Sequence, residues 1–184
     1  MSPRYTRTAI FLHWLMALGL LGTFALGLYM PDLPLSPTKL KLFSWHKWAG
    51  VSLFFLGLVR LAWRLSHPAP PLPTTIAPAL RLAAHAMHGL LYALMLAIPL
   101  SGWLMSSAKG FQTVWFGVLP LPDLLPKDAT LGNRLRELHE LLNYALLGLV
   151  IVHAGAALKH HYLDRDDVLT RMLPAKSAAD RRVP

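Results

Sequence analysis

Apolar residues gather in four long stretches, and the segments between them are rich in proline and charge. The stretches cover approximately residues 9–30, 48–65, 82–105 and 138–158. Each is near the roughly 20 residues that a helix needs to cross a hydrocarbon core about 30 Å thick. Backbone groups in lipid must pair within their own segment, so each stretch is expected to be helical. The pattern predicts an all-α fold, an integral membrane four-helix bundle surrounded by lipid.

Composition supports a membrane protein and excludes several other classes. Hydrophobic residues make up 54% of the chain, charged residues only 15%, and the mean hydropathy is +0.42. The chain has no cysteine, which excludes disulfides, iron–sulfur clusters, Cys-ligated zinc and a covalently attached c-type haem. The net charge of +9 does not indicate nucleic-acid binding, because the basic residues lie between the apolar stretches instead of forming one patch.

Proline positions predict where the helices end. Several prolines interrupt residues 66–79, which are therefore expected to form a loop between the second and third stretches. Residues 109–136 are expected to form a longer loop, whose Trp115 and Phe116 suit the membrane interface. Pro99 falls inside the third stretch and is expected to kink that helix.

A single domain is expected, comprising residues 1–174 and followed by a polar tail at 175–184. The polar, mixed-charge sequence begins earlier, at Asp164, and the whole segment from there is expected to be a surface or disordered end without an assigned role. The first stretch follows two basic residues, Arg4 and Arg7, as the apolar region of a signal peptide does. It is too long for such a region, so we expect it to stay in the protein as a membrane span.

The distribution of basic residues predicts the orientation of the bundle. With four spans, both termini and the second loop lie on one side, which carries 11 Lys and Arg residues, while the other side carries 7. The positive-inside rule then places both termini in the cytoplasm.

The histidines are the candidates for chemistry, because an ionisable side chain within a membrane span is costly and is usually functional. Nine are present, and four occupy the ends of three expected spans: His13, His46, His139 and His153. Fourteen residues separate His139 from His153, which on a helix is a rise of about 21 Å and nearly a whole number of turns. One helix therefore presents two imidazoles on nearly one face.

Alternating span directions pair these histidines by depth, His13 with His153 and His46 with His139. Two neutral imidazoles from facing helices can ligate the two faces of a haem, and bis-histidine ligation favours electron transfer because it leaves no open position on the iron. Two other possibilities remain open. The histidines could form a metal-ion or proton pathway, and His85 or His88, which share one helix face, could replace His13 as the inner ligand.

Several short motifs in this order and spacing resemble those of the bacterial cytochrome b561 proteins, of the broad class that includes the cytochrome b subunits of hydrogenases and formate dehydrogenases. The resemblance runs from Tyr5 to about Pro174. The matching segments are Arg7 to Trp14, His46 before Gly50, Val59-Arg60-Leu61, Ala84-His85-Ala86-Met87-His88, Leu138-His139-Glu140, His153-Ala154-Gly155 and His160-His161-Tyr162.

The resemblance implies two non-covalent b haems, with one haem iron ligated by His13 and His153 and the other by His46 and His139. It also implies a protein of the bacterial inner membrane that exchanges electrons with quinone. One activity attributed to the group is oxidation of superoxide with reduction of ubiquinone.

Residues around these histidines have expected supporting roles, and no catalytic group beyond the haems is expected. Arg7, Arg60 and Arg64 lie at the inner helix ends, where haem propionates need partners. His160 could hydrogen-bond a quinone carbonyl at the inner interface. Five lysines could make a cationic outer surface that steers a small anion. These lysines are Lys39, Lys41, Lys47, Lys109 and Lys127.

Three functions are compatible with these features. The first is a self-sufficient oxidoreductase that moves electrons between an outer donor and quinone. The second is a haem-bearing anchor that accepts electrons from a separate peripheral dehydrogenase or hydrogenase. The third is a haem-free transporter that uses the histidines for protons or metal. The short loops favour the first.

Overall fold

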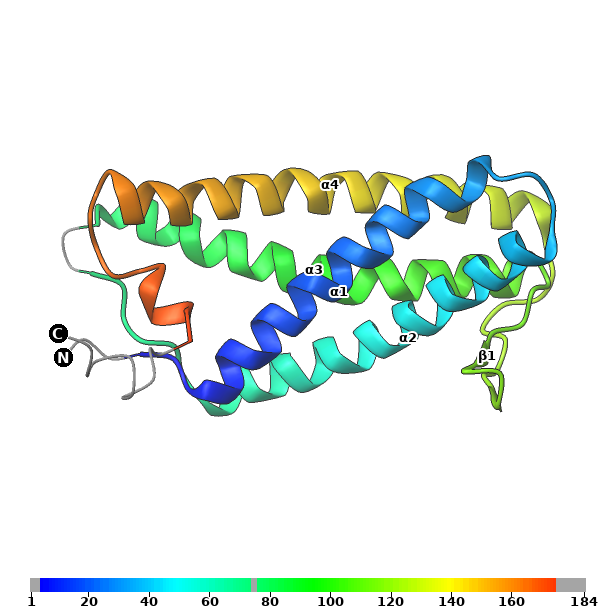
Figure 1. Cartoon of the computed structure of the whole chain (residues 1–184), viewed down its shortest axis with the longest axis horizontal. Helices are drawn as coiled ribbons and strands as arrows, with labels where there is room; N and C mark the ends of the chain where they lie inside the picture. Colours follow the sequence, from blue (N-terminus) through cyan, green and yellow to red (C-terminus); the bar gives the residue numbers. More distant parts are fainter. Residues whose placement is uncertain (1–3, 74–75, 175–184) are drawn as a thin grey trace, which may run out of the picture.

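The protein is a bundle of four long helices, α1 (Arg7–Tyr29), α2 (Pro37–Ser66), α3 (Pro78–Ala108) and α4 (Ala129–Tyr162) (Figure 1). The computed structural model describes residues 4–73 and 76–174, so the predicted tail at 175–184 lies outside the described residues. All four helices are long and apolar enough to cross a membrane, with mean hydropathies of 1.4 to 1.9 in their most apolar windows. The predicted helical membrane bundle is confirmed.

Hydrogen-bonding caps explain why two helices begin earlier than the apolar pattern predicts. α2 begins at Pro37 instead of position 48, because Ser36 accepts the backbone N–H of Lys39 and proline is well suited to a first turn. α4 begins at Ala129 instead of position 138, because Asp128 accepts the N–H of Leu131. Charged residues within the first three turns of each helix hide these segments from a hydropathy pattern. The predicted loop at 109–136 is therefore shorter than expected.

The remaining part of that loop contains a small hairpin, which the sequence did not reveal. Its strands β1 (Val114–Trp115) and β2 (Leu119–Pro120) pair antiparallel, and the turn between them includes Gly117 at φ 73°. The hairpin rests on α2, where Trp48 donates its indole N–H to the Val114 carbonyl at 2.6 Å. Trp115 donates in turn to the Ser52 hydroxyl at 3.2 Å. This end of the bundle, with Tyr29, Pro37, Ala108 and Ala129, is called the outer end.

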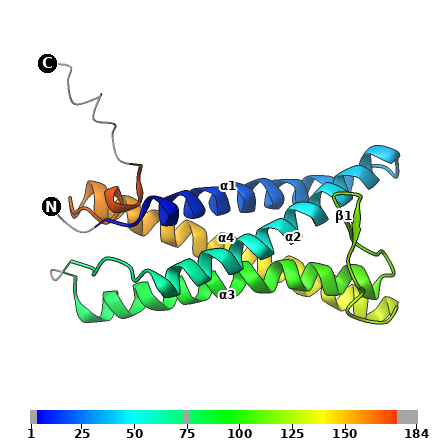
Figure 2. The same cartoon turned by 90° about the horizontal axis from the view of Figure 1, so that it is seen from below.

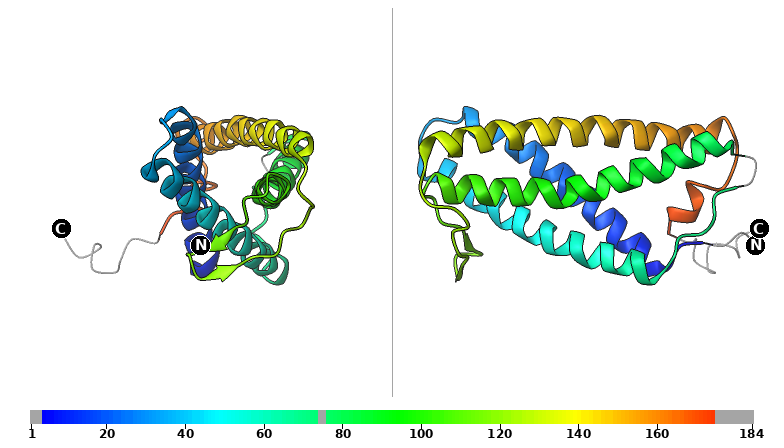
Figure 3. Two further views of the ribbon diagram at one scale, coloured as in Figure 1. Left: turned by 90° about the vertical axis from the view of Figure 1, so that its right-hand side faces the viewer. Right: turned by 180° about the vertical axis from the view of Figure 1, so that it is seen from behind.

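Neighbouring helices pack in sequence order, α1 on α2, α2 on α3 and α3 on α4. Met16, Leu53 and Met95 form a small buried cluster at the centre. Most other large apolar side chains face outward, as Leu18 and Ile151 do with 66% and 62% of their surface exposed. Such exposure is expected where lipid is the solvent. α3 contains Pro99 and changes direction along its length (Figure 3).

The chain beyond α4 folds back onto the bundle as an ordered surface segment, which was one of the two alternatives expected from Asp164 onward. Residues 163–174, here called the hook, contain the short 3-10 helix η2 (Thr170–Met172). They lie across the end of the bundle opposite the outer end, which is called the inner end (Figures 1 and 2). Trp14 on α1 donates to the Met172 carbonyl at 2.9 Å. Arg4 donates to the carbonyls of Thr170 and Leu173 at 2.9 and 2.7 Å.

A buried arginine anchors the hook to the proline-rich loop. Arg171 is only 8% exposed and donates to the Pro71 carbonyl at 2.7 Å. Its guanidinium also pairs with Asp167 at 2.7 Å. Hydropathy did not predict this fold because the segment is polar and its contacts with the bundle and the proline-rich loop are distant in sequence.

Candidate functional site

The outer pair of histidines faces each other across the bundle, His46 from α2 and His139 from α4. Their ring centres are 6.3 Å apart and their planes are 81° apart. The Nδ1 of His139 lies 3.1 Å from the Ile98 carbonyl and 2.9 Å from the Ser101 hydroxyl, so its proton has two acceptors and Nε2 is left free to bind a metal. The Nδ1 of His46 is buried without a hydrogen-bond partner among the described residues.

The inner end brings together three histidines, not two. His13 on α1 and His153 on α4 have ring centres 6.3 Å apart. His88 on α3 lies closer to His153, at 5.3 Å. Its Nδ1 donates to the Ala84 carbonyl at 2.7 Å, and the residue is more exposed than His13 or His153. His85 forms no hydrogen bond or ring contact with this group among the described residues, although it interacts electrostatically with His88.

Ring spacing distinguishes these pairs as possible ligands of one metal. A metal ion bonds an imidazole nitrogen at about 2 Å, so two imidazoles on opposite sides of one metal, as on the two faces of a haem, have ring centres about 6 Å apart. The spacing of 6.3 Å in the pairs His13–His153 and His46–His139 fits this geometry. The 5.3 Å between His88 and His153 is about 1 Å too short.

Glycines leave room for a flat ligand beside the histidines. A Cβ placed on Gly50, Gly148 or Gly155 would have no atom within 4 Å beyond its own chain neighbourhood. Gly27 and Gly102 instead lie against the rings of His46 and His139, where a Cβ would approach Cε1 to 3.2 and 3.1 Å. The residues present thus fit two bis-histidine haem sites, one near each end of the bundle.

The close contact at Gly102 gives a local test of the outer site. We expect Gly102→Ala to displace the His139 ring by a few tenths of an ångström, because that contact is too tight for the ring to stay in place. If each histidine pair ligates one haem, the electron paramagnetic resonance spectrum of a haem at His139 should change while that of a haem at the inner pair stays as in the wild type. Unchanged spectra at both haems would contradict the placement of His139 as a ligand.

Arg60 brings a positive charge into the inner site without a carboxylate partner among the described residues. One guanidinium nitrogen lies 3.1 Å from His13 Nδ1, another donates to the Ala9 carbonyl at 3.3 Å, and the group lies over the Tyr92 ring at 5.7 Å. If Nε2 of His13 binds iron, Nδ1 carries a proton and cannot accept from Arg60. The guanidinium must then turn to another acceptor, and a haem propionate is one of suitable charge.

The other predicted propionate partners and the five outer lysines differ in the contacts they make. Arg7 and Arg64 have no hydrogen bond or ion pair within the described residues. Two of the five lysines close loops: Lys39 donates to the Pro31 and Leu33 carbonyls, and Lys47 donates to Ser106, Phe111 and Gln112. Lys41 lies over the Trp45 ring at 5.0 Å, and Lys109 and Lys127 line a hollow of about 200 Å³.

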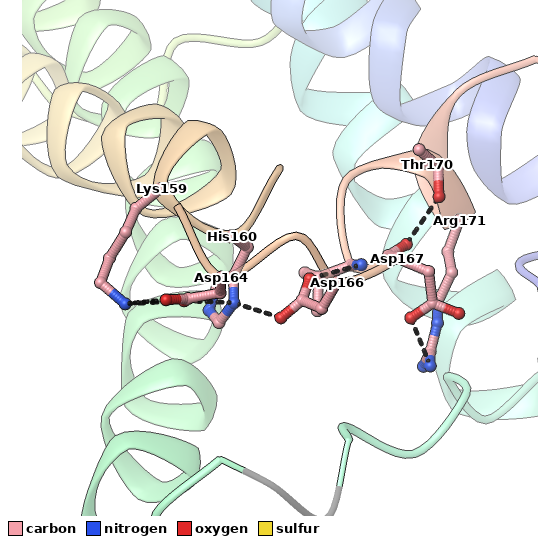
Figure 4. Close-up of polar contacts among 8 residues, drawn as sticks. Lys159, His160, Asp164, Asp166, Asp167, Thr170 and Arg171 are labelled. Atoms are coloured by element: carbon pink, nitrogen blue, oxygen red, sulfur yellow. Dashed lines mark hydrogen bonds and ion pairs between the residues drawn. The ribbon is translucent and has the colours of Figure 1, made fainter. Parts of the chain in front are cut away.

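His160 lies at the inner end of α4, where the hook begins (Figure 4). Its Nδ1 contacts Asp166 at 2.6 Å and Asp164 at 3.2 Å. Lys159 donates to both oxygens of Asp164 at 2.6 and 2.8 Å, and this hydrogen bonding lowers the pKa of that carboxyl. Sequence reasoning missed both carboxylates, although acidic residues closely following His160 were a usable signal.

Comparison with known proteins identifies the family. The family model described as "Prokaryotic cytochrome b561" matches residues 4–175. "Cytochrome b561 homolog 2" of Escherichia coli (strain K12) is 38% identical over 96% of this chain and 94% of its own. "Cytochrome b561 homolog 1" of the same organism is 33% identical, over 94% and 98%. "Probable superoxide oxidase CybB" of Yersinia pestis is 29% identical, over 96% and 99%. The chain therefore belongs to the prokaryotic cytochrome b561 family, and it is a multi-pass membrane protein that binds haem b and transfers electrons.

Proposed function

We propose that this cytochrome holds two b haems, ligated by His13 with His153 and by His46 with His139. We further propose that it oxidises superoxide at the outer end and reduces ubiquinone at the inner end. The observation that carries the proposal is the pair of facing imidazoles near each end of one bundle, both with ring centres 6.3 Å apart. The name of the Yersinia pestis relative supports superoxide as the donor. Membership of a haem b family sets aside the haem-free transporter.

The residues of this chain would hold and orient the cofactors, while haem b supplies reversible one-electron chemistry at its iron. Ile98 and Ser101 fix the ring of His139 through Nδ1. Arg60, with Arg7 and Arg64 near the same end, would neutralise propionates. Two superoxide anions each lose one electron to become O₂, and one quinone takes up those two electrons and two protons to become quinol.

The two ends suit different substrates. Three outer lysines do not bond loop carbonyls as Lys39 and Lys47 do, and their ammonium groups would attract a small anion to the outer end. They are Lys41, Lys109 and Lys127. At the inner end, the carboxylates on Nδ1 of His160 would hold that ring in place. When Nε2 also carries a proton, its N–H can donate to a quinone oxygen.

The proposed location is the bacterial inner membrane, with both termini in the cytoplasm. The excess of Lys and Arg on the terminal side supports this orientation. Superoxide would then be taken from the periplasmic side.

The test uses the purified, haem-loaded protein with an enzymatic source of superoxide and a short-chain ubiquinone. We expect superoxide to reduce the haems and quinol to form. His160→Ala should slow quinol formation at least about tenfold without slowing haem reduction, because the ring acts only at the quinone. His161→Ala is the matched control.

Two outcomes would redirect the proposal. Haems that superoxide does not reduce, but that a copurifying dehydrogenase does, would favour the anchor function. Quinol formation unaffected by His160→Ala would place the quinone elsewhere.

A further inference from the structure

The groups surrounding the two histidine pairs differ in charge, and this difference has consequences for electron flow. We propose that Ser101 lowers the reduction potential of the outer haem and that Arg60 raises that of the inner haem, so that electrons move favourably from the outer to the inner end. The proposal rests on the ligand pairs given under Proposed function. Ser101 and Arg60 act through neighbouring groups and are positioning residues.

Ser101 is placed to increase electron donation by His139. The serine is 4% exposed, and its hydroxyl donates to the Ile98 carbonyl at 2.7 Å. Its oxygen is therefore free to accept the Nδ1 proton of His139 at 2.9 Å, alongside the Ile98 carbonyl at 3.1 Å. Two acceptors on one N–H make the imidazole more basic. A more basic ligand favours the ferric state and lowers the potential.

The outer site also has a negative charge beside this ligand. Glu140 follows His139 in α4 and interacts electrostatically with it. Glu140 is partly neutralised by Arg136 at 3.8 Å. Lys47 follows His46, but its ammonium is bonded to Ser106, Phe111 and Gln112 at the loop, and Asp123 opposes its charge.

Arg60 gives the inner site the opposite character. Its guanidinium lies 3.1 Å from His13, and no carboxylate pairs with it in the part of the chain that the structure describes. A positive charge near the iron favours the added electron, and low-dielectric surroundings strengthen the effect. In contact with His13 the guanidinium adds a positive charge beside the ligand. If it turns to a propionate, it offsets that group's negative charge, which also favours the added electron. Arg64, one turn further along α2, adds a second positive charge.

The consequence is a free-energy gradient built into the bundle. An electron that a donor gives to the outer haem would pass to the inner haem in an energetically downhill step. It would then reside at the end of the bundle where His160 lies. Quinone receives two such electrons with two protons, and the donor loses one electron in each event. The reverse flow, from quinol to an outer acceptor, would be uphill between the haems.

The experiment is a potentiometric titration of the haem-loaded protein followed by absorbance. His139→Ala and His153→Ala assign each potential, because each variant should keep only one haem. We expect the outer haem of the wild type to have the lower potential. Ser101→Ala should shift the oxidation equilibrium of the outer haem about tenfold towards the reduced state, which is 59 mV for a one-electron couple. Arg60→Gln should shift the inner haem by a similar factor towards the oxidised state.

Matched variants separate tuning from general damage. Ser44→Ala removes a serine whose only side-chain hydrogen bond to the described residues is to the Leu40 carbonyl, so it should leave both potentials unchanged. Arg81→Gln removes a positive charge from the same side of the bundle and should change the inner potential less than Arg60→Gln. Arg60→Lys should restore most of the inner potential because the charge is kept. If Arg60→Gln loses the inner haem, two other results test the inference. Arg60→Lys should have nearly the wild-type inner potential, and Ser101→Ala should shift the outer potential alone.

Equal potentials in the wild type, or a higher potential at the outer haem, would overturn the inference. So would a Ser101→Ala shift that is absent or that affects both haems equally. A protein with two haems but no quinol formation would contradict only the proposed substrates, since the potentials could still be measured. A protein without two histidine-ligated haems would instead contradict the proposed ligation.

Discussion

Replacing His139 with alanine is expected to halve the haem content of the purified protein, from two haems to one. The outer site would keep only His46, and a single imidazole leaves one face of the haem without its axial ligand. His153→Ala should do the same at the inner site, where His13 would remain alone. Pyridine haemochrome assays give the haem content, and reduced-minus-oxidised spectra show which haem is lost.

His67→Ala and His88→Ala are the controls for this experiment. His67 stacks on Trp63 at 3.9 Å in the proline loop, so its loss should leave two haems. His88 lies closer to His153 than two imidazoles on opposite faces of one haem would, and two haems should again remain. Loss of a haem in His88→Ala, with both retained in His13→Ala, would show that His88 is the inner ligand.

Asp167→Asn is expected to detach the hook from the bundle. The change leaves the buried Arg171 guanidinium without its charge partner, and an uncompensated buried charge is costly. Because Asp167 is itself about one-third exposed, we expect the opening of the hook to become easier by about 2 kcal/mol, or roughly thirtyfold. Hydrogen exchange measured by mass spectrometry should show faster exchange in residues 163–174 and little change in the helices.

Asp32→Asn makes the same chemical change at the exposed outer end and should not alter exchange in the hook. Protection of the hook that is unchanged in Asp167→Asn would show that the Pro71 and Arg4 contacts suffice to hold it.

The helical membrane fold could be predicted because lipid imposes a simple physical requirement. A segment that crosses must be apolar over about 20 residues and must pair its own backbone groups. The four stretches meet this requirement, and each is part of a helix in the structure. The depth pairing of His13 with His153 followed from the same reasoning, since span direction and helical rise set the depth of each residue. In the structure the centres of those two rings are 6.3 Å apart.

What could not be predicted depends on polar contacts between residues distant in sequence. The helix starts at Ser36 and Asp128 depend on single capping hydrogen bonds in charged segments. The hook depends on Arg171 meeting a proline loop 100 positions earlier in the chain. Ser101 could not be recognised as a neighbour of His139 because helical spacing does not determine which side chain of α3 faces α4.

Both His139 and His153 lie on α4, which is synthesised after the three other long helices that the structure describes. The first three helices supply one proposed ligand for each haem, so neither site has both ligands until α4 is in place. Folding of α4 against its partners would then complete both sites together, which couples cofactor capture to the docking of that helix. A chain truncated before α4 would lose both haems at once, and partially assembled protein with one complete centre should not accumulate.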